Sequence, residues 1–265
     1  MENRGLESST VFDWDGSDDE GRSAPPGAML VGKIWASKAI NVRAAIDSMV
    51  KLWNPKGKIA GNILDPKEKV FLFRFDDERD KTRVLDGQPW HFDKFVWCLN
   101  EPQEDGKPVE TPLYNLPIWA RVYDLPLKGR SNEANLRRIG TQIGHYVGVD
   151  EAPFPEMERA VRIRVIHDVR RPLKKAVEIR LSSNKVFDFK IKYEKLPTFC
   201  YGCGVLGHGE KDCDEGPYET EELSFGDDLR ASPWKVVKTN VEAASKVARN
   251  LSREFADEQK RREEV

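Results

Sequence analysis

Residues 28–99 alternate between strand-like and helix-like spacing of apolar positions. The run 28–35 is apolar and strand-like, and Asn41 is a predicted N-cap for a helix over 42–53. Strands are predicted at 59–64, 70–75 and 92–99, and a second helix at 78–85 is expected to end at Gly87. The apolar positions of the first helix are Val42, Ala45, Ile46, Met49, Val50 and Trp53.

The order strand, helix, strand, strand, helix, strand predicts an α+β domain over 28–102. It is the split βαβ arrangement of ferredoxin-like folds, to which the RNA recognition motif (RRM) belongs. Two helices on one face of such a sheet leave the other face free for bases. With Phe71, Phe73 and Phe75 turned to the helices, Val70, Leu72 and Arg74 lie on that free face. Base-stacking aromatics are therefore missing there, which argues against RNA binding by this sheet.

A second small α+β unit is predicted over 113–196, after a linker rich in Pro, Gly, Asp and Glu at 103–112. Its expected elements are a strand at 118–123, a helix at 132–147 and strands at 161–166, 176–181 and 186–193. The helix stripe consists of Leu136, Ile139, Ile143 and Tyr146.

Apolar and polar residues alternate along the last three strands of this unit, so one face is apolar and the other is basic. A solvated outer face is the simplest interpretation. The alternative is contact with nucleic-acid phosphates, because this face leads directly into the next segment. The candidate phosphate-binding residues are Arg162, Arg164, Arg180, Lys190 and Lys192.

Charge is segregated along the chain, although its formal sum is only −2. Residues 1–26 carry 2 basic and 7 acidic groups, residues 113–200 carry 17 and 10, and residues 214–265 carry 9 and 13. A polyanion is thus expected to meet the middle of the chain. We predict a disordered acidic arm at 1–26, and an acidic linker and tail helix at 216–265, with self-association through that helix as an open alternative.

The N-terminus lacks the basic and apolar regions of a secretory signal, and no window has the roughly 18 apolar residues of a membrane helix. These features predict an intracellular protein, in the nucleus or cytoplasm, without a membrane partner. No catalytic nucleophile, phosphate loop or small-molecule site is recognisable, which argues against an enzyme.

Three of the four cysteines and one histidine lie within fourteen residues, with the spacing C-x2-C-x4-H-x4-C. Cys200, Cys203, His208 and Cys213 would fill the four positions of a tetrahedral Zn²⁺ ion, the single cofactor expected. No position remains for water or substrate, so the ion is structural. Gly204 and Gly207 would supply the turns. Cys98, within an apolar strand, is expected to be a buried hydrophobic residue.

A zinc knuckle of this kind binds unpaired bases through an aromatic residue that follows its first cysteine. Tyr201 has this position, and Lys211 is a basic residue within the motif. Single-stranded RNA or DNA is therefore the expected partner, although Tyr201 could instead pack against Phe199. The alternative function is a zinc-stabilised protein-interaction module in which Tyr201, Val205 and Leu206 form the docking surface.

Several segments give the chain a family resemblance. They include Phe-Leu-Phe-Arg-Phe-Asp at 71–76, Val-Leu-Asp-Gly-Gln-Pro-Trp at 84–90, Leu-Pro-Thr-Phe-Cys at 196–200 and the run 225–234. The chain resembles plant transposon-derived proteins in which a domain of unknown function precedes a CCHC knuckle, as in the first open reading frame of LINE-type retrotransposons. The resemblance implies a gag-like, non-catalytic protein that binds nucleic acid and zinc.

Overall fold

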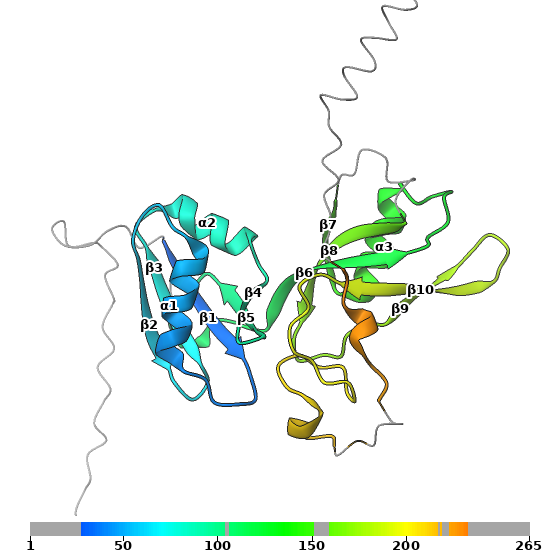
Figure 1. Cartoon of the computed structure of the whole chain (residues 1–265). Coiled ribbons are helices and arrows are strands. Elements are labelled where there is room, and N and C mark those ends of the chain that lie inside the picture. The colour runs from blue at the N-terminus through cyan, green and yellow to red at the C-terminus, as the bar shows by residue number, and fades with distance from the viewer. Residues whose placement is uncertain (1–27, 104–105, 151–158, 217, 219–222, 233–265) are drawn as a thin grey trace, which may run out of the picture. The chain divides into compact units, whose positions relative to one another are not determined.

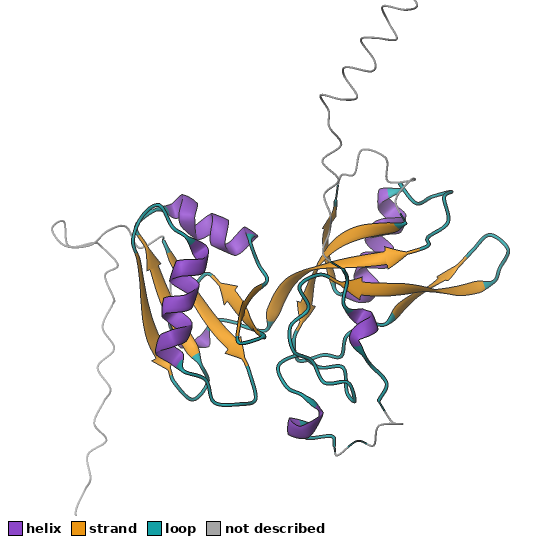
Figure 2. Ribbon diagram, in the orientation of Figure 1, coloured by secondary structure: helices purple, strands orange, loops and turns teal. Residues whose placement is uncertain are grey.

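The computed structural model describes residues 28–103, 106–150, 159–216, 218 and 223–232. It has a mixed α+β architecture with two five-stranded antiparallel sheets and few helices (Figures 1 and 2). The described residues up to Arg230 form one compact unit. The predicted acidic arm and tail helix lie outside the described residues. Within the described part of the chain, no helix has the length and apolar character of a membrane span.

The first sheet has the strand order β2-β3-β1-β5-β4. Its elements are β1 (Met29–Trp35), α1 (Val42–Trp53), β2 (Ile59–Asp65), β3 (Val70–Phe75), α2 (Glu78–Asp86), β4 (Trp90–Phe92) and β5 (Phe95–Asn100). The Asn41 side chain accepts a hydrogen bond from the Ala44 N–H at 3.0 Å, which confirms the predicted N-cap of α1. The one strand predicted at 92–99 is instead a hairpin of β4 and β5.

The core of the first sheet lies between its strands and the two helices. Phe71, Phe73 and Phe75 are buried there with Trp53 of α1 and Val84 of α2, which confirms the predicted orientation of β3. The Trp53 and Phe73 rings meet edge to face, with centroids 4.8 Å apart. Packing of Trp53 and Val84 against the phenylalanines of β3 places both helices on the same face.

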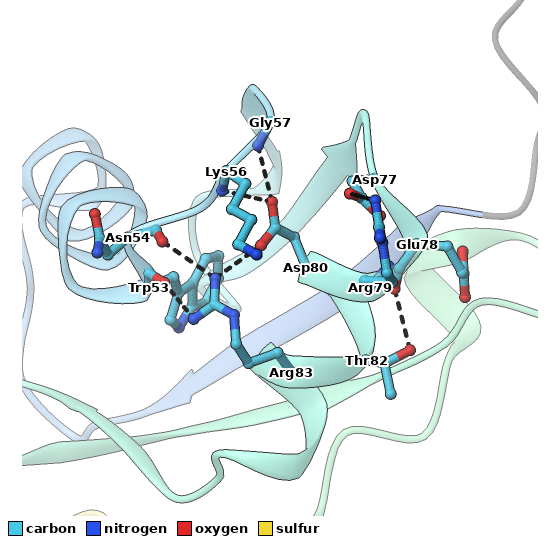
Figure 3. Close-up of polar contacts among 10 residues, drawn as sticks. All are labelled: Trp53, Asn54, Lys56, Gly57, Asp77, Glu78, Arg79, Asp80, Thr82 and Arg83. Atoms are coloured by element: carbon cyan, nitrogen blue, oxygen red, sulfur yellow. Dashed lines mark hydrogen bonds and ion pairs between the residues drawn. The ribbon is translucent and has the colours of Figure 1, made fainter.

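Asp80 links the two helices of the first sheet (Figure 3). Its buried carboxylate accepts hydrogen bonds from the N–H groups of Lys56 and Gly57 at 2.7 and 2.9 Å, and from Arg83 Nη2 at 2.9 Å. Arg83 also donates to the Trp53 carbonyl oxygen at the end of α1 at 2.7 Å. The backbone N–H of Gly57 and the Arg83 side chain together hold the pKa of Asp80 below its usual value.

The second face of this sheet is not free at its centre, contrary to the prediction. Val31, Val96 and Cys98 have no exposed surface and belong to a second core, which includes the strands of the second sheet. Cys98 is the buried hydrophobic residue that was predicted, and burial raises the pKa of its thiol. The bases of a nucleic acid therefore have no access to the middle of this face.

The second sheet has the order β7-β8-β6-β10-β9. Its elements are β6 (Asn115–Tyr123), α3 (Glu133–Ile143), β7 (His145–Val149), β8 (Ala160–Asp168), β9 (Ala176–Arg180) and β10 (Val186–Tyr193). The 3₁₀ turn Pro108–Glu110 lies in the predicted linker.

The predicted helix over 132–147 is too long. Helix α3 ends at Ile143, the backbone of Gly144 is extended, and the next five residues form β7. Tyr146 pairs with Val165 of β8 and remains buried, so its apolar character fits both patterns. Gly144 and the β-sheet hydrogen bonds decide the outcome, because glycine is a poor helix former.

The apolar face of the second sheet packs on α3 through Leu136, Ile139 and Ile143. Ile163 and Val165 of β8 are fully buried in the same core as these residues of α3. Phe187 departs from the predicted pattern, with 44% of its surface exposed. It lies near the turn of the β9–β10 hairpin, beyond the reach of the core.

Candidate metal centre and nucleic-acid interface

Cys200, Cys203, His208 and Cys213 converge after β10 and are positioned to bind one zinc ion. Their candidate ligand atoms all lie within 4.8 Å of one another. Cys203 Sγ and His208 Nε2 are 3.4 Å apart. Ligands at ordinary Zn–S and Zn–N lengths on a tetrahedron would be roughly 3.6 Å apart. The donor set and the spacing therefore fit a structural Zn²⁺ ion.

Backbone hydrogen bonds shape the loop that carries the ligands. The Cys200 N–H donates to the Val205 carbonyl oxygen, and the Gly204 N–H donates to that of Cys200, both at 2.9 Å. Gly204 and Gly207 have φ values of +76° and +91°, as their predicted role in the turns requires. Phe199 and Leu206 form a β-bridge across the loop, and both side chains are buried.

Two thiols of the site, those of Cys203 and Cys213, differ in how readily they ionise. Burial, with the neighbouring Cys213 and Cys200 thiols, raises the pKa of Cys203 to about 12. Burial also acts to raise the pKa of Cys213, but hydrogen bonds from the Glu215 backbone and from His208 outweigh it and lower that pKa to about 7. Zinc binds thiolates, so metal binding must release protons, including the one that Cys203 holds at neutral pH.

Hydrogen bonds fix the knuckle to both sheets. The Ser37 N–H, just after β1, donates to the Gly207 carbonyl oxygen at 2.9 Å, and Ser37 Oγ donates to Asp212 Oδ2 at 3.1 Å. On the side of the second sheet, the Leu173 N–H donates to the Gly204 carbonyl oxygen at 3.0 Å. The knuckle is thus a packed part of the fold.

Residues 223–230, here called the strap, cover one side of the knuckle. The Phe225 N–H donates to the Tyr201 carbonyl oxygen at 2.9 Å, and the Phe225 ring lies over Gly204. Arg230 donates from Nη1 to the Leu196 carbonyl oxygen and from Nη2 to that of Pro197. The run 225–234 enters the family resemblance, but no local pattern in the sequence predicts its contact with the knuckle.

Tyr201, the predicted base-stacking residue, contacts both the knuckle and the strap. Its ring centroid is 5.0 Å from that of Phe199, and its hydroxyl donates to Asp227 Oδ1 at 2.6 Å. Partial burial and the Asp227 carboxylate raise the pKa of its hydroxyl. The predicted protein-docking surface of Tyr201, Val205 and Leu206 is smaller than expected, because only 2% of the Leu206 surface is exposed. Lys211 is exposed in the 3₁₀ turn Glu210–Asp212.

The predicted basic face carries an acidic residue at its centre. Glu194 accepts hydrogen bonds from Arg162 Nε at 2.8 Å and from Arg121 Nε at 2.7 Å. Arg162 also pairs with Asp150 at 3.1 Å. Burial tends to raise the pKa of Glu194, but hydrogen bonds from the two arginines lower it overall. Arg121 lies opposite Lys192 and Arg162 in the strand register, a cross-strand placement that the sequence alone did not reveal.

The other candidates for phosphate contact are distributed over three strands. Arg164 lies over the Trp119 ring at 5.3 Å and donates to the Asp86 carbonyl oxygen. Lys190 is exposed on β10, and Lys192 lies 6.0 Å from the Tyr123 ring centroid. Arg180 lies on the edge strand β9, where it donates to Asn184 at 3.2 Å. Arg180 is thus separated from the row formed by Arg162, Arg121 and Lys192.

The fold and the site together define an α+β protein with one CCHC zinc knuckle. Residues 27–101 match a family described as a domain of unknown function (DUF4283), and residues 167–215 match the family described as "Zinc knuckle". The order of these two matches is the arrangement that the family resemblance predicts.

Among curated proteins, none matches the chain. The chain is similar to a solved structure titled "Structure of the C. elegans NONO-1 homodimer", with 13% identity over 90% of this chain and 91% of that one. The TM-score of 0.22 is too low to support a shared fold or function.

Proposed function

We propose that this protein binds single-stranded RNA or DNA and does so without catalysis. The zinc-knuckle match on a converged CCHC cluster carries the proposal, because knuckles of this type hold unpaired nucleic acid. Arg164, Lys190, Lys192 and Lys211 would attract the phosphates.

We also propose a biological setting for this activity. We infer a ferredoxin-like, RRM-like topology for the first sheet from its strand order, and this topology and the order of the two domains favour a gag-like protein derived from a LINE-type retrotransposon. Such a protein would act inside the cell, in the nucleus or the cytoplasm, and self-association would assist in coating RNA. The protein-interaction alternative is less favoured, because Leu206 is buried and Tyr201 is engaged with Asp227.

Binding can be tested by the fluorescence anisotropy of a labelled single-stranded RNA at 50 and 200 mM salt. We expect the zinc-loaded protein to bind and to lose affinity as salt rises, because phosphate contacts release counterions. Cys203→Ser should bind weakly, whereas Cys98→Ala, which removes a cysteine outside the zinc site, should bind like the wild type. Failure of the zinc-loaded wild type to bind at low salt would refute the proposed function.

A further inference from the structure

A groove of about 360 Å³ lies between α3, the loop that precedes it and β9. Its lining includes four basic residues and one acidic residue, Glu178, which gives a formal charge of +3. Of the basic residues, only Arg180 belongs to the predicted basic face, and none belongs to the zinc site. The basic residues are Lys128, Arg130, Arg138 and Arg180.

Arg130 is the residue that distinguishes this groove. Only 6% of its surface is exposed, and its Nε and Nη2 atoms are buried without a hydrogen-bond partner among the described residues. A buried guanidinium without a counter-ion is strongly unfavourable, because it has lost its hydration without replacement.

The other buried charged residues of the described chain are compensated. Asp80 pairs with Arg83 at 2.9 Å, Lys81 with Glu78 and Glu101 at 2.5 and 2.7 Å, and Arg121 with Glu194 at 2.7 Å. No such ion pair involves Arg130 in the described structure. An anion from outside the chain would supply the missing partner.

The surroundings of Arg130 are suited to a phosphate group. Lys128, Arg138 and Arg180 are exposed along the groove, so they can reach an anion that Arg130 holds from within. Guanidinium groups bind phosphate oxygens through paired, charge-assisted hydrogen bonds. A charge of +3 with several donors exceeds what a single carboxylate would balance. We propose that this groove is a phosphate-binding site in which Arg130 is the central donor.

The phosphate could belong to a nucleic-acid backbone or to a free phosphate compound, and the chemistry at Arg130 is the same for both. The backbone source rests on the proposed function and extends it, because it adds a contact far along the sequence from the knuckle. A free-phosphate source does not depend on that function.

Thermal unfolding tests the site itself. The zinc-loaded protein is heated in sodium phosphate and in sodium chloride of equal ionic strength. At a phosphate concentration about ten times its Kd, we expect the midpoint of thermal unfolding to be about 3 to 5 °C higher in phosphate than in chloride. Arg130→Gln should abolish this difference. Arg43→Gln, the same change at an exposed residue of α1, should retain it.

If Arg130→Gln does not fold, Lys128→Gln combined with Arg138→Gln tests the same groove at exposed positions, and it should halve the shift or more. Equal midpoints for the wild type in phosphate and chloride would overturn the proposal. An undiminished phosphate shift in both altered proteins would overturn it as well.

RNA binding then identifies the source of the phosphate. If the source is a nucleic acid, Arg130→Gln should weaken binding about three- to tenfold and reduce the slope of log K against log salt by about 0.7. If phosphate stabilises the protein but the RNA slope is unchanged, the ligand is a free phosphate compound. Absence of RNA binding by the wild type would refute the proposed function alone, whereas RNA binding without any phosphate effect would refute only this site.

Discussion

The two sheets have the same strand order when their strands are matched by position, β2-β3-β1-β5-β4 against β7-β8-β6-β10-β9. They differ in the connection between the third and fourth strands of each sheet. Between β3 and β4 the chain forms helix α2, whereas between β8 and β9 it forms a loop, residues 169–175. In the first sheet α2 completes the core through Val84. In the second sheet the loop contacts the knuckle and the strap.

The loop makes these contacts through its backbone and one lysine. The Leu173 N–H donates to the Gly204 carbonyl oxygen, and Lys175 Nζ donates to that of Ser224 at 3.0 Å. The Tyr193 hydroxyl accepts from the Lys174 N–H and donates to its carbonyl oxygen, which fixes the loop on β10. Val169 and Leu173 of the loop are also buried in the core. The same connection therefore serves only the core in the first sheet, whereas in the second sheet it serves the core and also holds a metal centre.

Removal of zinc should produce the largest difference between the two sheets. Chelation or Cys203→Ser should unfold the knuckle, since metal binding contributes on the order of 10 kcal/mol to such sites. Hydrogen exchange should then accelerate at the amide of Leu173, which loses its acceptor on Gly204, and at Cys200 and Gly207. Amides of β3 should remain protected. Equal deprotection of β3 and the loop would mean that the knuckle supports both sheets alike.

The second-largest effect is expected at Glu194, which joins β10 to two arginines of the second sheet. Glu194→Gln removes the charge that compensates the buried Arg121, and should reduce the free energy of unfolding by about 2 to 4 kcal/mol in urea titrations. It should also tighten RNA binding, because the change removes a negative charge from the face that carries Arg162 and Lys192. Asp188→Asn on the exposed side of β10 removes the same charge and should leave stability nearly unchanged.

A smaller effect is expected where the strap meets the knuckle. A Cβ atom on Gly204 would lie 2.4 Å from the Phe225 ring, and its φ of +76° disfavours other residues. Gly204→Ala should lower stability by about 1 to 2 kcal/mol from the backbone alone and displace the strap. Zinc affinity, measured by competition with a chelator, should fall. Gly209→Ala is the matched control, because no atom lies within 4 Å of its Cβ position.

Much of this architecture could be predicted from the sequence where local signals agree. Asn41 as an N-cap, the alternation of Phe71, Phe73 and Phe75, and the cysteine and histidine spacing each specify structure within a few residues. Tyr146 was misplaced because its apolar character fits a helix stripe as well as a strand.

The remaining features depend on contacts between distant residues. The pairing of Glu194 with Arg121 follows from the strand register, and the cover of Gly204 by Phe225 joins positions 21 residues apart. The burial of Val31, Val96 and Cys98 depends on the second core. No local pattern specifies these contacts. The sequence therefore could not predict which sheet face is exposed to a ligand or which charged side chains are paired within the fold.

The smallest effect should come from Asp80, which links α1 to α2 and has no counterpart in the second sheet, where α2 is absent. The folded-state pKa of Asp80 is lowered, so its ionised form stabilises the fold above about pH 4, the usual value for Asp. This contribution is lost as the pH falls through the lowered pKa. Asp80→Asn should therefore be less stable than the wild type at pH 7, and the difference should shrink below pH 4.

Urea titrations across this pH range test whether the charge of Asp80 is responsible. Asp76→Asn, an exposed neighbour, should show no such trend. A deficit for Asp80→Asn that stayed constant with pH would place the effect in packing and not in the charge of Asp80.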